Sequence, residues 1–235
     1  MNSALCVNKL NQPIGHALPN WESAQFPNTQ LLIGEYCRLE RLDPKLHSDD
    51  LFKANSFDQE GRNWTYLPYG PFDSYQDYSQ WLEKISNIND PYFFAIIDLN
   101  SMKAIGLLAL MRISPEVGTI EVGHINYSPL LQKNIAATEA MYLIMKYCFA
   151  IGYRRYEWKC DHLNEASRLA AIRLGFQFEG TFRQATIYKG RTRDTDWFSI
   201  LDSEWPKRQS AFEAWLSPKN FDQNKIQIKS LARNE

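Results

Sequence analysis

The chain has 235 residues, with 26 Lys and Arg against 27 Asp and Glu, a formal net charge of −1, and 44% hydrophobic residues. This balance gives no surplus of cations for a phosphate backbone, which argues against a nucleic-acid-binding protein. Apolar runs such as Tyr92–Ile97 are far shorter than the roughly 20 residues that span a membrane, so no membrane span is predicted.

Targeting and cysteine patterns point to the cytoplasm. The first twenty residues are polar where a secretory signal needs a continuous apolar segment. The four cysteines have neither a CxxC spacing nor the density of a disulfide framework, so free thiols in a reducing compartment are expected. They also give no reason to expect a metal site.

The first half of the chain predicts an arm followed by alternating strands and helices. Residues 1–30 are rich in Pro and Asn and read as an arm over the surface, with Trp21 and Phe26 docked. A strand over Leu31–Leu42 and a helix over Pro44–Ala54 follow. The aromatic segment Trp64–Pro71 is open to two interpretations, a substrate entrance or a structural corner, and a helix over Ser74–Ile88 comes next.

The second half predicts a sheet with one deeply buried helix. Its expected strands cover residues 92–98, 104–113, 119–128, 154–160, 176–182 and 194–201, and the short connections between the first three require antiparallel neighbours. The predicted helix over Ala136–Ala150 is apolar almost all round, so it must pack on the sheet. A second helix begins after an N-cap at Asn164 and ends at Gly175. We therefore expect an α/β (α+β) fold.

The loop Gln132–Ala137 leads from a strand into the buried helix. Free N–H groups and the positive end of a helix dipole attract anions, and the small Ala136 and Ala137 would let a diphosphate approach the backbone. The glycines of a P-loop are missing, so the loop by itself leaves phosphate binding open.

Residues Gln132–Ala140 resemble the acyl-CoA loop of the GNAT superfamily of N-acyltransferases, whose pattern is Gln/Arg-x-x-Gly-x-Gly/Ala, often followed by Thr-Glu-Ala in the RimJ/RimL branch. Ile135 stands where the family usually has glycine. Other segments between about residues 32 and 205 also match motifs of that branch: Ile120–His124, Asn164-x-x-Ser167, Leu174–Phe176 with Glu179-Gly180, Asp194-x-x-Trp197–Ser199, and Glu204-Trp205. The expected division is an arm over 1–30, a GNAT domain over 31–205 and a C-terminal extension over 206–235.

The resemblance implies a GNAT fold, with a mixed, mostly antiparallel central sheet of about seven strands flanked by helices. It also implies an N-acetyltransferase that transfers acetyl from acetyl-CoA to a primary amine by direct attack in a ternary complex, with no metal. The acceptor would be a protein N-terminal α-amine or a small-molecule amine, and a homodimer is suggested. The residues expected to bind coenzyme A are Ile125, Tyr127, Gln132, Lys133, Asn134, Ile135, Ala136, Ala137, Thr138, Asn164 and Ser167.

Three residues are candidates for the chemistry. Glu121 matches a carboxylate that the RimJ/RimL branch places beside the acceptor amine, and its alternative role is a structural ion pair with an Arg. His124 is a second base candidate, and Ser167 could protonate the thiolate or only cap its helix. Trp64, Tyr66 and Tyr69 would contact the acceptor together with Glu121.

Two other interpretations stay open. Cys160-Asp161-His162 could form an acyl-cysteine or metal site, although neighbouring residues at a strand end seldom converge on one point. The rival to an enzyme is a non-catalytic acyl-CoA-binding or protein-interaction module on the same fold, and Ile135 is the feature that keeps this alternative open.

Overall fold

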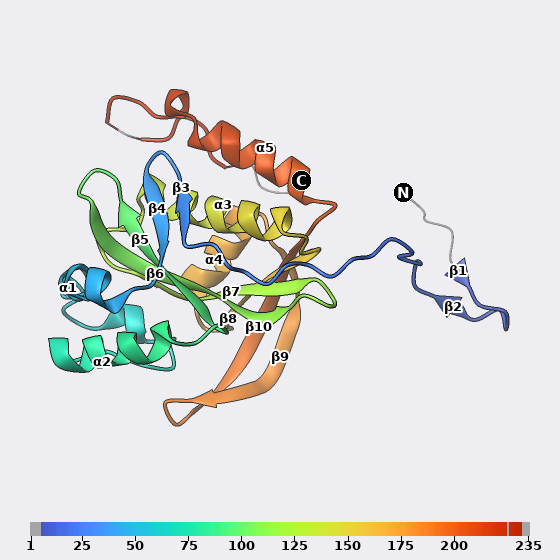
Figure 1. The fold of residues 1–235 in the computed structure, drawn as a ribbon, viewed down its shortest axis with the longest axis horizontal. Helices are drawn as coiled ribbons and strands as arrows, with labels where there is room; N and C mark the ends of the chain where they lie inside the picture. The colour runs from blue at the N-terminus through green and yellow to red at the C-terminus, as the bar shows by residue number, and fades with distance from the viewer. Residues whose placement is uncertain (1–5, 225, 232–235) are drawn as a thin grey trace.

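The computed structural model describes residues 6–224 and 226–231. An eight-stranded sheet runs in the order β3-β4-β5-β6-β7-β8-β10-β9 (Figure 1). All neighbours are antiparallel except β7 and β8. The strands are β3 (Leu31–Ile33), β4 (Cys37–Arg41), β5 (Tyr92–Asp98), β6 (Lys103–Ser114), β7 (Thr119–Tyr127), β8 (Arg155–Asp161), β9 (Gln177–Tyr188) and β10 (Arg191–Leu201).

Five α-helices cover the two faces of this sheet, as Figure 1 shows. The helices are α1 (Pro44–Asn55), α2 (Tyr75–Ser86), α3 (Ile135–Ala150), α4 (Glu165–Leu174) and α5 (Trp205–Leu216), with 3-10 turns at Arg62–Trp64 and Pro218–Asn220. Alternate side chains of β5 enter two different cores. Phe93, Ala95 and Ile97 pack with α1 and α2, whereas Phe94 and Ile96 pack with α3, α4 and α5. The predicted mixed, mostly antiparallel sheet is confirmed.

The segment Leu31–Leu42 forms two strands, so the prediction of a single strand there was wrong and the sheet has eight strands rather than about seven. The cause is the buried carboxylate of Glu139 on α3. It accepts backbone hydrogen bonds from Glu35, Tyr36 and Cys37 at 2.8, 2.7 and 2.7 Å, which holds a turn between β3 and β4. Gly34 is needed there, because a Cβ at this position would lie 2.4 Å from Cδ of Glu139.

Residues at the two ends of α4 define that helix, as the sequence predicted. The side chain of Asn164 accepts from the N–H of Ser167 as the N-cap of α4, and Gly175 ends that helix with φ +94°, both as predicted. The hairpin of β9 and β10 is longer than predicted, with its turn at Lys189 and Gly190.

The N-terminal arm docks in part. The indole of Trp21 donates to the carbonyl of Glu116 at 3.0 Å, as the predicted docking requires, but Phe26 is 44% exposed and does not dock. A short hairpin of β1 (Cys6–Val7) and β2 (Pro13–Ile14) lies away from the main sheet (Figure 1). No helix among the described residues is long and apolar enough to cross a membrane.

Candidate active site

The sheet is split between its two parallel strands. The ladder between β7 and β8 covers only Thr119–Val122 and Arg155–Trp158, although both strands continue beyond it. At this point β7 bulges away from β6, and His124 in the bulge has φ +50°. A cavity of about 1070 Å³ lies here, lined by both strands, the loop before α3, and α4. The strand divergence therefore gives a ligand access to the backbone at the middle of the sheet.

The first turn of α3 forms one side of this cavity. The side chain of Asn134 caps the helix by accepting from the N–H of Ala136 at 3.0 Å. Of the residues predicted in this loop, Gln132, Lys133, Asn134, Ile135, Ala137 and Thr138 line the cavity, whereas the side chain of Ala136 is buried in the core. Ile135 is the first helical residue and has no left-handed φ, so this position does not require the freedom of glycine.

Arg173 lies next to this turn, and sequence reasoning missed it. Both terminal nitrogens of its guanidinium donate to Oγ1 of Thr138, at 3.1 and 3.2 Å. Arg173 lines the cavity, and no carboxylate among the described residues pairs with it. Burial lowers the pKa of this guanidinium, but the side chain stays charged. Its position in the last turn of α4 is ordinary for a basic residue, so the sequence carried no sign of the cavity.

The edge of β7 beyond the split includes the two predicted pantetheine partners. Ile125 and Tyr127 both line the cavity. The carbonyl of Tyr127 accepts from Nδ2 of Asn63 at 3.2 Å and from Nε2 of Gln132 at 3.0 Å. Gln132 therefore connects the loop to the strand edge, and a ligand that uses the Tyr127 carbonyl must share or displace these side chains.

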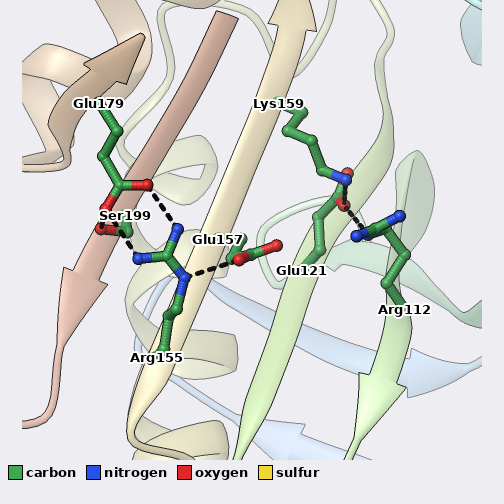
Figure 2. Close-up of polar contacts among 7 residues, drawn as sticks. All are labelled: Arg112, Glu121, Arg155, Glu157, Lys159, Glu179 and Ser199. Carbon is green, nitrogen blue, oxygen red and sulfur yellow. Dashed lines mark hydrogen bonds and ion pairs between the residues drawn. The ribbon is translucent and has the colours of Figure 1, made fainter. Parts of the chain in front are cut away.

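Glu121 lies on the wall of the same cavity and is 5% exposed. Figure 2 shows its carboxylate between two cations, with Nζ of Lys159 2.6 Å and Nε of Arg112 3.3 Å from Oε2. Burial raises the pKa of Glu121, and the two cations oppose this rise. Burial also lowers the pKa of Lys159. The ion pair that was the alternative role of Glu121 is therefore present, with Arg112 and also with Lys159. Both ion pairs use Oε2, and Oε1 has no ion-pair partner among the described side chains.

Neighbouring Glu157 belongs to a second ion-pair cluster. It is the parallel partner of Glu121 in the ladder, so two carboxylates lie side by side. Arg155 donates from Nε to Glu157 at 2.6 Å and from Nη1 to Glu179 at 2.7 Å, and Ser199 also donates to Glu179 (Figure 2). Each carboxylate of the pair therefore has its own cation.

His124 faces the cavity from the bulge. Its Nδ1 lies 3.0 Å from the hydroxyl of Tyr69, and its ring packs against Tyr69 and Phe93. Burial lowers the pKa of His124 to about 4. The imidazole is therefore neutral at pH 7 and a weak base for an ammonium group.

Ser167 and Asn164 lie at the start of α4, on the cavity wall. The indole N–H of Trp158 donates to Oγ of Ser167 at 3.0 Å, which leaves the hydroxyl hydrogen of Ser167 for another acceptor.

Cys160 lines the cavity too, but burial raises its pKa to about 11. A protonated thiol is a poor nucleophile, which disfavours an acyl-cysteine.

The aromatic segment divides between the cavity and a structural corner. Tyr66 lines the cavity, and its hydroxyl donates to the carbonyl of Leu163 at 3.1 Å. Trp64 and Tyr69 do not line it. They form a corner with the aromatic rings of Phe72, Tyr78 and Trp81.

Further cavity residues come from distant parts of the chain. Arg193 of β10 lines the cavity and has no ion pair with a described carboxylate. The C-terminal extension contributes Trp215, Phe221, Ile226 and Gln227. Within residues 6–224 and 226–231, no group of three or more His, Cys, Asp and Glu is placed to hold a metal.

Comparisons with known proteins agree with this geometry. A family model described as an acetyltransferase (GNAT) domain matches residues 38–177. A GCN5-related N-acetyltransferase from Brucella melitensis is 48% identical, has a TM-score of 0.89, and aligns over 91% of this chain and 97% of its own. A protein from Chromobacterium violaceum ATCC 12472, described as a probable acetyltransferase of the GNAT family, is 40% identical with a TM-score of 0.77, over 83% of this chain and 98% of its own.

A more distant structure is the acetyl transferase from Salmonella typhimurium that modifies the N-terminal serine of a 50S ribosomal subunit protein. It is 19% identical with a TM-score of 0.61, over 72% of this chain and 96% of its own, and shares the fold. No curated protein matches the sequence. With the family model and two relatives at 48% and 40% identity, the chain belongs to the GNAT family of N-acetyltransferases, which transfer an acetyl group from acetyl-CoA to an amine.

Proposed function

We propose that this chain transfers acetyl from acetyl-CoA directly to a primary amine in the cavity between β7 and β8. The observation that carries the proposal is the composition of this one cavity. It has the first turn of α3 and the cation of Arg173 on one side, which suit a diphosphate, and the carboxylate of Glu121 on another, which suits an ammonium group.

In the proposed reaction Glu121 takes one proton from the acceptor ammonium, directly or through a water. The neutral nitrogen then bonds to the thioester carbonyl carbon, and the carbon–sulfur bond breaks. Ser167, whose hydroxyl hydrogen is not used by Trp158, donates a proton to the departing sulfur and regains the second proton that the nitrogen loses. The products are an amide, a thiol and a protonated Glu121. His124, neutral with its pKa near 4, would contribute by position rather than as the base.

The charges near Glu121 favour some acceptors over others. The carboxylate of Glu121 already has two cationic partners, Lys159 and Arg112, and it shares the cavity with the cation of Arg193 and the carboxylate of Asp161. A second cationic group of a polyamine placed near Glu121 would be repelled by Lys159 and Arg112, whereas an α-amine with a neutral or anionic remainder would not be. Within the RimJ/RimL hypothesis, which rests on the loop and strand motifs, this favours a protein N-terminus or an amino acid.

We further propose membership of the RimJ/RimL branch, a homodimer, a cytoplasmic location, and domain boundaries at 1–30, 31–205 and 206–235. The non-catalytic alternative rested on Ile135. Because this residue takes an ordinary helical position, it gives that alternative no support.

The experiment is a thiol-release assay with acetyl-CoA and a panel of amines that differ in charge: peptides with free N-termini, amino acids, their amides, and polyamines. We expect acceptor-dependent release that is strongest for neutral or anionic α-amines. Glu121→Gln should lower turnover by about 100-fold or more, within the range of general-base catalysis, while acetyl-CoA affinity stays within about twofold. Unchanged turnover of Glu121→Gln at every pH would remove Glu121 from the mechanism.

A further inference from the structure

The C-terminal extension closes one side of the cavity, although the family match ends at residue 177. Trp215 of α5 and three residues beyond it line the cavity together with Thr138 and Arg173. We call these four residues the C-terminal wall: Trp215, Phe221, Ile226 and Gln227.

The wall is held in place by hydrogen bonds within the extension. The indole of Trp215 donates to Oε1 of Gln227 at 2.8 Å, and the two rings of Trp215 and Phe221 meet edge to face at 5.2 Å. Asn220, only 8% exposed, donates to the carbonyls of Trp215 and Lys229 at 3.0 and 3.1 Å. These contacts tie Gln227 and Lys229 to Trp215 and Asn220, so the described residues after α5 fold back on the end of that helix.

The wall adjoins the body of the protein through Arg173. The guanidinium carbon of Arg173 lies 5.0 Å from the centroid of the Trp215 ring, and the same guanidinium donates to Thr138 in the first turn of α3. A cation without a carboxylate partner among the described residues therefore lies between a helix N-terminus and an apolar surface.

The apolar part of this surface is accessible. Ile226 is 62% exposed and Phe221 is half-buried, and both line the cavity. A ligand that combines phosphates with a flat aromatic base fits such a surface, because guanidinium groups bind phosphates and apolar side chains pack against bases.

We propose that the C-terminal wall is part of the coenzyme A site: Arg173 binds a phosphate of the nucleotide, and the adenosine lies against Phe221 and Ile226. This inference rests on the proposed function, because it assigns a binding position to the nucleotide end of acetyl-CoA, the acyl donor of the proposed reaction. It gives the extension a function in binding, outside the part of the chain that the family model covers.

The test is calorimetric titration of the full chain with two probes, coenzyme A and adenosine 3′-phosphate 5′-diphosphate, which is the nucleotide part alone. Ile226→Glu places a carboxylate on the exposed wall, and Ile228→Glu is its matched control, because Ile228 is 65% exposed and does not line the cavity. Arg173→Gln removes the cation, and the exposed Arg183→Gln is its control. Melting curves check that each variant folds.

We expect Ile226→Glu and Arg173→Gln each to weaken the binding of both probes by about tenfold or more, the loss typical of one charged hydrogen bond or one repulsive charge. Ile228→Glu and Arg183→Gln should bind as the wild type does. Wild-type affinity in folded Ile226→Glu and Arg173→Gln would overturn the inference and leave the proposed function standing. Failure of the wild type to bind coenzyme A would instead contradict the proposed function itself.

Discussion

Nζ of Lys159 lies 2.6 Å from Oε2 of Glu121, so the carboxylate proposed as the base is already ion-paired before any acceptor binds. The lysine side chain is 10% exposed and lies 4.1 Å from the ring centroid of Trp197. Without Lys159, only Arg112 at 3.3 Å would oppose the effect of burial on Glu121, and the carboxylate would be harder to ionise. Lys159 therefore keeps Glu121 charged and ready to accept a proton.

The first prediction is that Lys159→Gln shifts the pH dependence of turnover. The proposed base must be ionised, and loss of the neighbouring cation raises the pKa of Glu121, so activity should fall off at a higher pH. We expect the acidic limb of kcat/KM to move upward by about one pH unit or more. The measurement is a pH profile with the best amine of the panel. Lys103→Gln, which removes an exposed ion pair with Asp50, is the control, and an unmoved limb in Lys159→Gln would contradict the account.

His124 should make the protein less stable in mild acid. Its pKa is about 4 in the folded protein against an ordinary value of 6.5, so the unfolded chain binds the additional proton between these values. The free energy of unfolding should fall as the pH is lowered from about 6.5 to 4, by up to about 3 kcal/mol from this residue.

His124→Asn tests this pH dependence, because asparagine tolerates the left-handed φ of +50° and does not titrate. Urea unfolding at a series of pH values should give a shallower loss of stability for His124→Asn than for the wild type. Asn in place of the exposed His16 should leave the slope unchanged. Equal slopes in His124→Asn and the wild type would rule out His124 as the source.

Glu139 should be a strong determinant of stability even though it takes no part in the chemistry. Its buried carboxylate accepts three backbone hydrogen bonds, from Glu35, Tyr36 and Cys37. In Glu139→Gln an amide N–H replaces one acceptor oxygen, so we expect a loss of about 2 kcal/mol or more in urea unfolding. Glu35→Gln, at an exposed position, should change stability by less than about 0.5 kcal/mol. A variant as stable as the wild type would show that the turn does not need the charge.

Arg155→Gln should also destabilise the protein, because it leaves Glu157, only 8% exposed, without its cation beside Glu121. We expect a loss of about 2–3 kcal/mol in chemical denaturation, below the cost of breaking a fully buried pair. Arg62→Gln breaks an exposed pair with Glu60 and should cost less than about 0.5 kcal/mol. Similar small losses in both variants would mean that the Arg155 cluster behaves as a surface pair.

The helices and strands that could be predicted from the sequence are determined by residues within or next to the same segment. The strand Tyr92–Asp98 and the buried helix α3 were clear because apolar residues fill each segment, and α4 was clear because Asn164 and Gly175 cap it. The separation of β3 from β4 could not be predicted, because the carboxylate that causes it lies about 100 residues away in the chain.

Some residues of the candidate site could also be predicted from a local sequence motif, and others could not. The loop residues Gln132–Thr138 form a contiguous motif, so they could be named from sequence, and all but Ala136 line the cavity. Lys159 beside Glu121 depends on the register of two parallel strands, and Arg173 beside Trp215 depends on how the extension folds back. A local sequence pattern predicts neither strand register nor tertiary packing, so these two contacts could be identified only from the structure.

The central claim is that the cavity at the first turn of α3 binds acetyl-CoA, and calorimetric titration of the wild type and Ala137→Asp tests it most directly. Ala137 lines the cavity in that turn, where an aspartate favours the helix but repels a diphosphate. We predict one binding site in the wild type, no binding in a folded Ala137→Asp, and retained binding in the neutral control Ala137→Ser. Absence of binding to the wild type, or wild-type affinity in Ala137→Asp, would contradict the account.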